Sequence, residues 1–207
     1  MSYLSAVKSL ANRHKQTVYA LQWDQMKGFD YLHPQGFYDV ILVYILPPEI
    51  IKLDKAAQKD TKVLIWTTYR MTGPVVLNGV TKQGRPLSLI ESTMTTSLGR
   101  HYLDGLARNS LDTLVIKSKT NTHSPDNSYI FALTLQALQS FSLKIMCFQF
   151  TYGWMTQWAK TSAYLLGPPV LISDTISIPS IMLQAGVHPH TVKWHKVPIR
   201  IGELEFL

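Results

Sequence analysis

The histidines near the carboxyl end are the side chains of this sequence whose spacing could hold a metal ion. His188, His190 and His195 lie in the segment VHPHTVKWH, and a strand would place His188 and His190 on the same side. No Cys or carboxylate stands nearby to complete a tetrahedral set, and Lys193 and Lys196 would repel a cation. The sequence therefore predicts no metal site. It favours a basic patch that gains charge when these histidines are protonated.

Motifs of the common enzyme classes are missing from the sequence. It contains no GxxxxGK[ST] loop, no GxGxxG, no GxSxG turn and no HExxH helix. Cys147 stands in the apolar segment LKIMCFQF, which is typical of a buried, unreactive thiol in a strand. We therefore expect a protein that is not an enzyme and needs no cofactor. The alternative is an enzyme whose site is assembled from distant residues, with candidates His101, His123, His188, His190, Asp104 and Glu91 in one pocket.

Positive charge is the feature of the sequence that predicts a partner. Lys and Arg total 20 against 13 Asp and Glu, which gives a net charge of +7 and an isoelectric point near 9.4. The excess must lie at the surface, because unpaired cations are almost never buried, so the expected partner is a polyanion. RNA, alone or in a ribonucleoprotein, and the anionic surface of a membrane both qualify, since each concentrates negative charge.

Three groups of basic residues form the predicted polyanion-binding site. Lys52, Lys55, Lys59 and Lys62 recur at intervals of three and four residues, so a helix would carry all four on one face. A solvated helix face without a ligand is the alternative interpretation of this group. Basic residues near the two ends of the chain complete the site. Its predicted members are Lys8, Arg13, Lys15, Lys52, Lys55, Lys59, Lys62, Lys193, Lys196 and Arg200.

Hydrophobic spacing predicts the elements that position these side chains. The apolar residues of segment 1–24 recur at roughly helical intervals between basic residues, which favours a basic amphipathic helix. The run FYDVILVYIL is β-branched and aromatic and ends at two prolines, which predicts a buried strand. We expect helices in 1–24, 49–62 and 87–108 and a short helix within 154–166. Strands are expected over 37–46, 61–72, 75–80 and 170–178, and Asn78-Gly79 is a signal for a hairpin turn. A three-stranded meander is expected over 111–119, 128–138 and 141–154, and a loop or edge strand over 187–200.

These elements and the chain length predict one α+β domain over residues 1–207, with a mixed or mainly antiparallel sheet and several flanking helices. A single cysteine excludes an intramolecular disulfide, which favours the cytoplasm or nucleus. No apolar run is long enough for a signal peptide or a transmembrane helix. A peripheral position at a membrane remains compatible with this sequence.

The function predicted from these features is structural. Apolar residues make up 46% of the chain and charged residues only 16%, so we expect self-association into a homo-oligomer through apolar and aromatic surface. Small viral matrix proteins, which assemble on membranes or ribonucleoproteins, provide an analogy of class only. An RNA-binding coat or nucleocapsid protein is the first alternative, and the enzyme described above is the second.

Overall fold

The structure is a computed structural model, and it describes residues 3–26, 32–59, 62–76, 86–108, 127–168, 173–181 and 192–201. Within these ranges the chain forms five α-helices, one short 3-10 helix and eight strands, which confirms the predicted α+β class. Its contacts divide it into two compact units. Met1–Met26 and Gly99–Leu207 form the sheet unit, and Lys27–Leu98 forms the helical unit. We describe each unit by itself, and the single domain stays a prediction.

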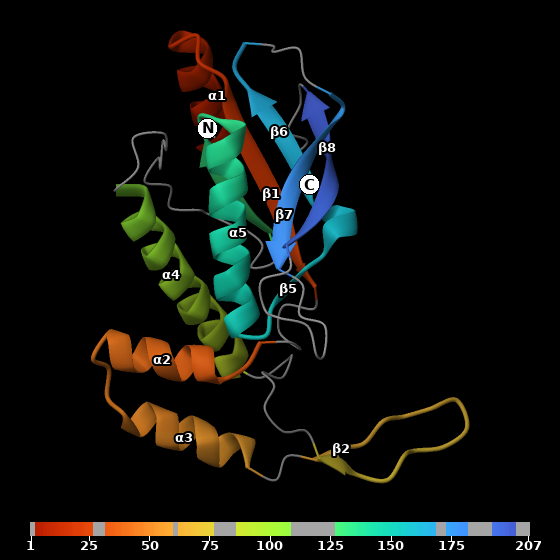
Figure 1. Cartoon of the computed structure of the whole chain (residues 1–207). Helices are drawn as coiled ribbons and strands as arrows, with labels where there is room; N and C mark the ends of the chain where they lie inside the picture. Colours follow the sequence, from red (N-terminus) through yellow and green to blue (C-terminus); the bar gives the residue numbers. More distant parts are fainter. Residues whose placement is uncertain are drawn as a thin grey trace. The chain divides into compact units, whose positions relative to one another are not determined.

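A mixed sheet is the centre of the sheet unit (Figure 1). Its strands run in the order β4-β1-β6-β8-β7, and β5 pairs with the end of β1. Every pair is antiparallel except β6 with β8, which is parallel. The bounds are Val18–Met26 for β1, Asn127–Ala132 for β4, Met155–Thr156 for β5, Ser162–Leu166 for β6, Thr175–Ile181 for β7 and Val192–Ile201 for β8.

Helix α5 (Leu135–Thr151) covers one face of this sheet (Figure 1). Thr134 begins the helix, because its hydroxyl oxygen accepts a hydrogen bond from the backbone N–H of Ala137 at 3.1 Å. Apolar side chains of the helix then pack against the strands in one buried cluster. The cluster includes Leu21, Trp23, Ile130, Leu138, Phe141, Ile145, Ile176, Ile178 and Val197.

Helix α1 (Tyr3–Arg13) covers part of the opposite face. Its buried residues Val7 and Ala11 pack against strands β1, β4 and β6 in a second cluster. The chain turns at Lys15, whose φ of 51° is left-handed, and then enters β1. Gly167, directly after β6, lies against this turn, and a Cβ there would collide with the backbone oxygen of Gln16. Only glycine fits that approach and the φ of +105° at this position.

The helical unit contains α2 (Gln35–Val43), α3 (Glu49–Gln58) and the first part of α4 (Pro86–Arg108). Its core contains Phe37, Tyr38 and Ile41, with Met94 of α4 packed against them. Asp54 of α3 is fully buried, and its carboxylate accepts hydrogen bonds from the Tyr38 hydroxyl at 2.8 Å and the Gln58 amide at 2.6 Å. Two short strands, β2 (Lys62–Val63) and β3 (Val75–Val76), pair in antiparallel register.

The predicted strand over residues 37–46 is wrong, because residues 37–43 belong to α2 and Tyr44 is the C-cap of that helix. Phe37, Val40 and Ile41 are buried at helical spacing, while Leu42 and Val43 are exposed. A continuous apolar run contains both a helical and a strand periodicity, so the pattern does not distinguish them. Packing of one stripe against α3 and α4 selects the helix here.

The predicted amino-terminal helix is correct only to Arg13, since residues 18–26 form β1. Strand β1 lies between β4 and β6 and is buried on both faces, so it has no clear alternation of apolar and polar residues. Val18 and Ala20 contact the cluster of α1, whereas Leu21 and Trp23 belong to the cluster of α5.

Three further expectations change in the carboxyl-terminal half. The middle strand of the predicted meander, 128–138, is a strand only to Ala132, because α5 begins at Leu135. The last strand, 141–154, is wrong, since α5 extends to Thr151. The first, 111–119, lies outside the described residues. Residues 154–166 form β5, the 3-10 helix Trp158–Lys160 and β6 in place of one helix. Strand β8 lies inside the sheet between β6 and β7, so residues 192–200 are not an edge.

Other elements agree with their predictions. Helix α4 confirms the helix over 87–108, α3 confirms the helix that follows the two prolines, and β7 overlaps the strand predicted over 170–178. Strands β2 and β3 are much shorter than predicted, and Asn78-Gly79 lies outside the described residues. None of the helices in the described part of the chain is long and apolar enough to span a membrane.

Candidate nucleic-acid interface

Strand β8 presents basic side chains on the face of the sheet opposite α5. Successive residues of a strand point to opposite faces, and Val197 belongs to the core beneath α5. Lys196 and Arg200 stand one and three residues from Val197, so they point to the opposite face. The register supports this placement, because Arg200 pairs with Tyr164, whose ring packs in the α1 cluster.

This part of the face is open to solvent. Helix α1 packs on β4, β1 and β6, and the exposed residues begin at β8. Trp194 is 56% exposed, which is unusual for so large an apolar side chain, and it is on the same face as Lys196 and Arg200. We call Trp194, Lys196 and Arg200 the β8 strip. On β7, Ser177 pairs with Lys196 and is exposed, whereas Pro179 pairs with Trp194 and is buried.

Helix α1 adds cations on the same side of the sheet. Lys8, Arg13 and Lys15 are all exposed, while Val7 and Ala11 turn inward. Because α1 packs on the face that carries the β8 strip, five of the predicted polyanion-binding residues lie on one side of the sheet unit. These five residues are Lys8, Arg13, Lys15, Lys196 and Arg200, and we call them the basic face. Lys193 is predicted with them, but strand alternation places it on the other side.

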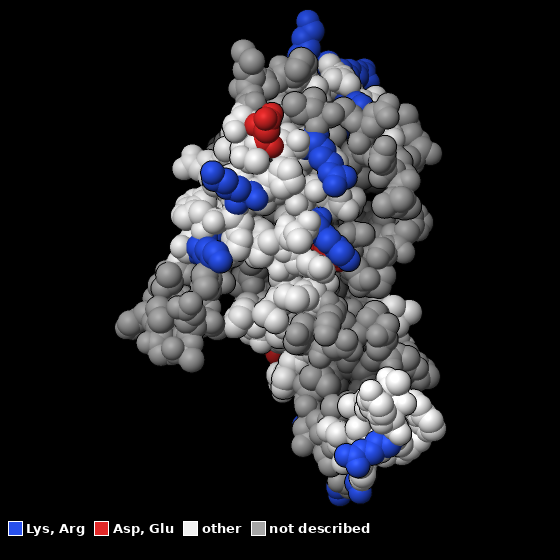
Figure 2. Space-filling model, turned by 90° about the vertical axis from the view of Figure 1, so that its right-hand side faces the viewer, with Lys and Arg blue, Asp and Glu red and all other residues white. Residues whose placement is uncertain are grey.

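Acidic side chains do little to offset this charge. Among the described side chains of the sheet unit, the Lys and Arg residues are Lys8, Arg13, Lys15, Lys144, Lys160, Lys193, Lys196 and Arg200, and the acidic residues are Asp24 and Asp174. Asp24 is already paired with Lys160 at 3.4 Å. Figure 2 shows blue Lys and Arg side chains spread over the sheet-bearing part, with little red between them. The unit therefore has a positive surface suited to a polyanion.

The four lysines of the helical unit do not share one helix. Helix α3 ends at Gln58, Lys59 is its C-cap with an extended ψ of 136°, and Lys62 belongs to β2. The expectation that all four lie on one helical face is therefore wrong. Lys52 and Lys55 remain on α3, and the Lys55 ammonium lies 5.1 Å from the centre of the Tyr38 ring. Polyanion binding by these lysines stays a prediction.

The predicted histidine patch is reduced to one described member. His188 and His190 lie outside the described residues. The ring of His195 stacks on Trp158, and its Nε2 lies 2.8 Å from the hydroxyl oxygen of Ser180. Burial, and next to it the charge of Lys193, lower the pKa of His195 below its ordinary value. The lowered pKa disfavours the charged form of His195, and strand alternation places its ring on the side of Lys193, away from the basic face.

Cys147 and the proposed enzyme pocket show no catalytic arrangement in the described residues. Cys147 lies on α5 and not on a strand, and burial raises the pKa of its thiol, which keeps it protonated and poorly nucleophilic. Glu91 is buried in the helical unit, whereas His101 is exposed. The side chain of Asp104, together with His123, His188 and His190, lies outside what the structure describes. Within the described residues, no three His, Cys, Asp or Glu side chains could hold a metal ion together.

Sequence reasoning missed Trp194 and Asp24. The alternation in the segment WHKVPIR contains the signal for Trp194, because a strand there places Trp194 beside Lys196 and Arg200. Asp24 is almost fully buried near the end of β1, and the register pairs it with Asn127 of β4. No motif in the sequence marks Asp24, since its position depends on the pairing of two distant strands.

The chain matches no protein-family model and no curated protein. Its fold is similar to parts of solved telomerase structures. Apo telomerase from Candida tropicalis, truncated from its C-terminal domain, superimposes with a TM-score of 0.56 at 13% identity, over 85% of this chain and 37% of that chain. Telomerase from the same organism, in complex with a TWJ fragment of telomeric RNA, gives 0.55 at 14% identity, over 78% and 29%. Candida albicans telomerase with a TWJ fragment gives 0.52 at 12% identity, over 84% and 31%.

This similarity is one of fold. Identities of 12 to 14% are too low to carry over residue roles. The chain also spans only about a third of the length of these telomerase chains.

Proposed function

We propose that this protein binds RNA, and that the basic face of the sheet unit contacts the phosphate backbone. The observation that carries the proposal is the position of Lys196 and Arg200 on the open half of the sheet, on the side where α1 adds Lys8, Arg13 and Lys15. Lysine and arginine bind phosphates without reading sequence, so the expected recognition is of the backbone. Trp194 offers a flat ring beside them on which one base could stack.

The fold similarity supports RNA over an anionic membrane. Two of the similar telomerase structures are complexes with a fragment of telomeric RNA. The matrix analogy gains no comparable support, and neither does membrane docking. We therefore prefer the RNA-binding alternative, without the coat or nucleocapsid role. Self-association and a cytoplasmic or nuclear location stay predictions.

Salt dependence gives the proposal a quantitative form. Each phosphate neutralised on a single strand contributes a slope of about −0.7 to the logarithm of affinity against the logarithm of salt concentration. Five contacts from the basic face would give a slope of about −3 to −4. A slope near zero would mean that the basic face does not bind phosphate.

The test compares two faces of one strand. Fluorescence anisotropy with a labelled single-stranded RNA of 20 nucleotides should show weaker binding by the double variant Lys196→Gln/Arg200→Gln, with a salt slope smaller in magnitude by about 1.4. The control is Lys193→Gln, which changes the same strand on the opposite face. A loss in Lys193→Gln that is half of the loss in the double variant, and therefore equal per charge removed, would mean that net charge, not the basic face, governs binding.

An enzyme is the second candidate, and Asp24 is the observation in its favour. Its carboxylate is on the α1 side of β1, near Lys160, and the backbone oxygen of Asp24 accepts a hydrogen bond from Gln157 at 2.9 Å. A carboxylate beside bound RNA could position a cation for phosphoryl transfer. The described residues do not assemble three metal ligands there, so we prefer binding without chemistry. Labelled RNA incubated with Mg²⁺ and nucleoside triphosphates should keep its length. A change of length that Asp24→Asn abolishes would favour the enzyme.

A further inference from the structure

The helical unit carries a hairpin arm, which we define as residues 62–76. Beyond the short pairing of β2 with β3, Trp66 and Met71 form an isolated antiparallel bridge. The Thr72 N–H donates to the carbonyl oxygen of Ile65 at 2.9 Å. Residues 62–76 are thus one continuous two-stranded arm, although its strands are short.

Thr67 holds the tip of the arm in a fixed shape. Its backbone N–H donates to the carbonyl oxygen of Arg70 at 3.0 Å, and its hydroxyl donates to the same oxygen at 2.6 Å. The Thr67 hydroxyl also accepts from the N–H of Arg70 at 3.1 Å. These bonds close a four-residue turn and fix the backbone on either side of Tyr69.

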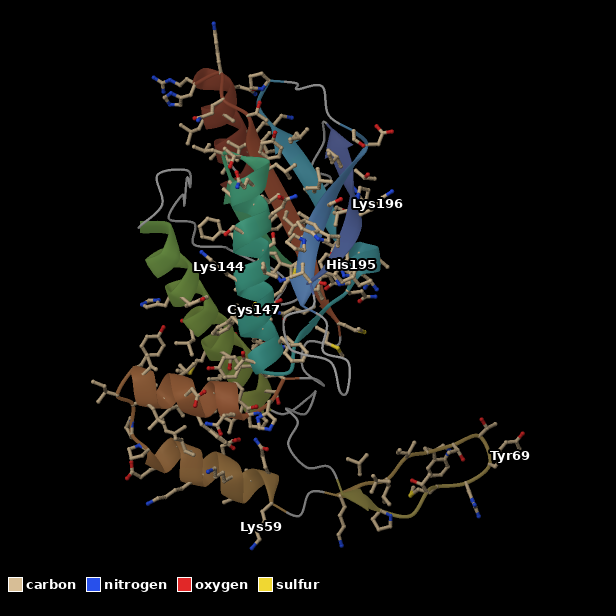
Figure 3. All side chains as sticks on the ribbon, viewed as in Figure 1. Lys59, Tyr69, Lys144, Cys147, His195 and Lys196 are labelled. Carbon is tan, nitrogen blue, oxygen red and sulfur yellow. The ribbon has the colours of Figure 1, made fainter. Side chains whose placement is uncertain are left out.

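Two aromatic rings are exposed on this arm. Tyr69 lies at the tip of the arm (Figure 3) and is 95% exposed. Trp66, directly before the turn, is 77% exposed. Leaving so much of a Trp ring in water is unfavourable compared with burying it, because apolar surface in water raises the free energy. A rigid turn that presents two rings to solvent is suited to a ligand with flat apolar faces.

The charge of the arm restricts the chemistry of that ligand. Residues 62–76 contain Lys62 and Arg70 and no acidic residue. Arg70 directly follows Tyr69 in the chain, and both side chains are exposed. A ligand that offers both flat rings and negative charge is a nucleic acid whose bases are unpaired, because paired bases hide their faces in the stack.

We propose that the hairpin arm is a stacking platform for unpaired bases of RNA. Trp66 and Tyr69 each stack on a base, and Arg70 and Lys62 contact the adjacent phosphates. The inference rests on the proposed RNA binding and adds to it a preference for single strands over duplexes. The basic face alone predicts no such preference, because lysine and arginine contact the phosphates of single-stranded and duplex RNA alike.

The polar tip argues against insertion of the arm into a bilayer. An arm that enters lipid would expose its apolar residues at the tip, whereas this tip consists of Thr67, Thr68, Tyr69 and Arg70. The exposed aliphatic residues Leu64 and Ile65 stand behind the tip. Stacking needs exposed rings with cations near them, and here Tyr69 is followed by Arg70 at the tip while Trp66 stands directly before the turn.

Matched variants of the full chain separate stacking from general apolar contact. Affinity is measured by anisotropy with a 20-nucleotide single strand and with a 20-base-pair duplex RNA. Trp66→Ala and Tyr69→Ala should each weaken single-strand binding about 5- to 150-fold and leave duplex binding unchanged. Tyr69→Phe, which keeps the ring, should bind like the unchanged protein. Leu64→Ala removes exposed apolar surface without removing a ring and should also bind normally.

The outcomes distinguish this inference from the function on which it rests. If the unchanged protein binds neither RNA, the proposed function fails. If it binds both, and Trp66→Ala and Tyr69→Ala bind the single strand normally, the platform alone is refuted. Binding to vesicles of phosphatidylserine and phosphatidylcholine that Leu64→Ala reduces as strongly as Trp66→Ala would show that the arm docks on lipid. Because all these side chains are exposed, thermal unfolding should be the same for each variant.

Discussion

The ring of His195 lies flat against the indole of Trp158, with the ring centres 3.7 Å apart and the planes within 3° of parallel. This stack joins β8 to the 3-10 helix that precedes β6, within the sheet unit. It also explains why the histidine disfavours a proton, since burial is the larger cause of its lowered pKa.

We expect His195 to make the stability of the protein depend on pH. Its pKa is lowered in the folded state, so below about pH 6.5 the unfolded chain takes up the proton first. The contribution is present above pH 6.5 and is lost as the pH falls. Urea unfolding at pH 7.5 and pH 5 should show a larger loss for the unchanged protein than for His195→Phe, which keeps a stacked ring but does not titrate. Equal losses would show that His195 is not responsible.

Gly167→Ala should destabilise the sheet unit by about 1–3 kcal/mol. Alanine disfavours the φ of +105° there, and its Cβ would collide with the backbone oxygen of Gln16. Chemical denaturation measures the change in free energy of unfolding. Gly105→Ala on α4 is the control, because no atom lies within 4 Å of a Cβ at that position. That variant should be neutral or slightly stabilising, and similar losses in both would contradict the steric explanation.

Tyr38→Phe should lower the free energy of unfolding by about 1–3 kcal/mol. The change removes the hydroxyl that donates to the buried Asp54 carboxylate at 2.8 Å, and no solvent reaches that carboxylate to replace it. Tyr69→Phe removes a hydroxyl from a fully solvated side chain and serves as the control. A Tyr38→Phe protein as stable as the control would mean that the hydrogen bond contributes little.

Thr134→Ala should cost about 0.5–2 kcal/mol, because it removes the side-chain cap of α5. Helix α5 packs on one face of the sheet, so loss of its first turn loosens Leu138 and its neighbours in the core. Thermal unfolding measures the loss. Ser140→Ala changes an exposed position within the same helix and should have no comparable effect. An unchanged melting temperature in Thr134→Ala would argue against the cap.

The sequence determined the parts of the fold that depend on local pattern. The long stripe of residues 87–108 is α4, and the segment after Pro48 is α3, because each has helical spacing and a clear start. For segments with apolar residues on every side, this pattern did not predict whether a helix or a strand forms. Residues 37–43 and 141–151 form helices and residues 18–26 a strand, although each is apolar enough for either. Local pattern is ambiguous for such segments, and packing decides them.

For the candidate site, too, the sequence determined one part and the tertiary structure another. Composition alone established that the protein carries excess positive charge and must display it, since burying unpaired cations costs too much free energy. Which cations stand together was decided only by the tertiary structure. The parallel pairing of β8 with β6 places Arg200 beside Tyr164, on the face of the sheet that α1 covers. Lys193, on the same strand, points to the opposite face. Strand register joins residues far apart in the chain, and a single sequence contains no record of that pairing.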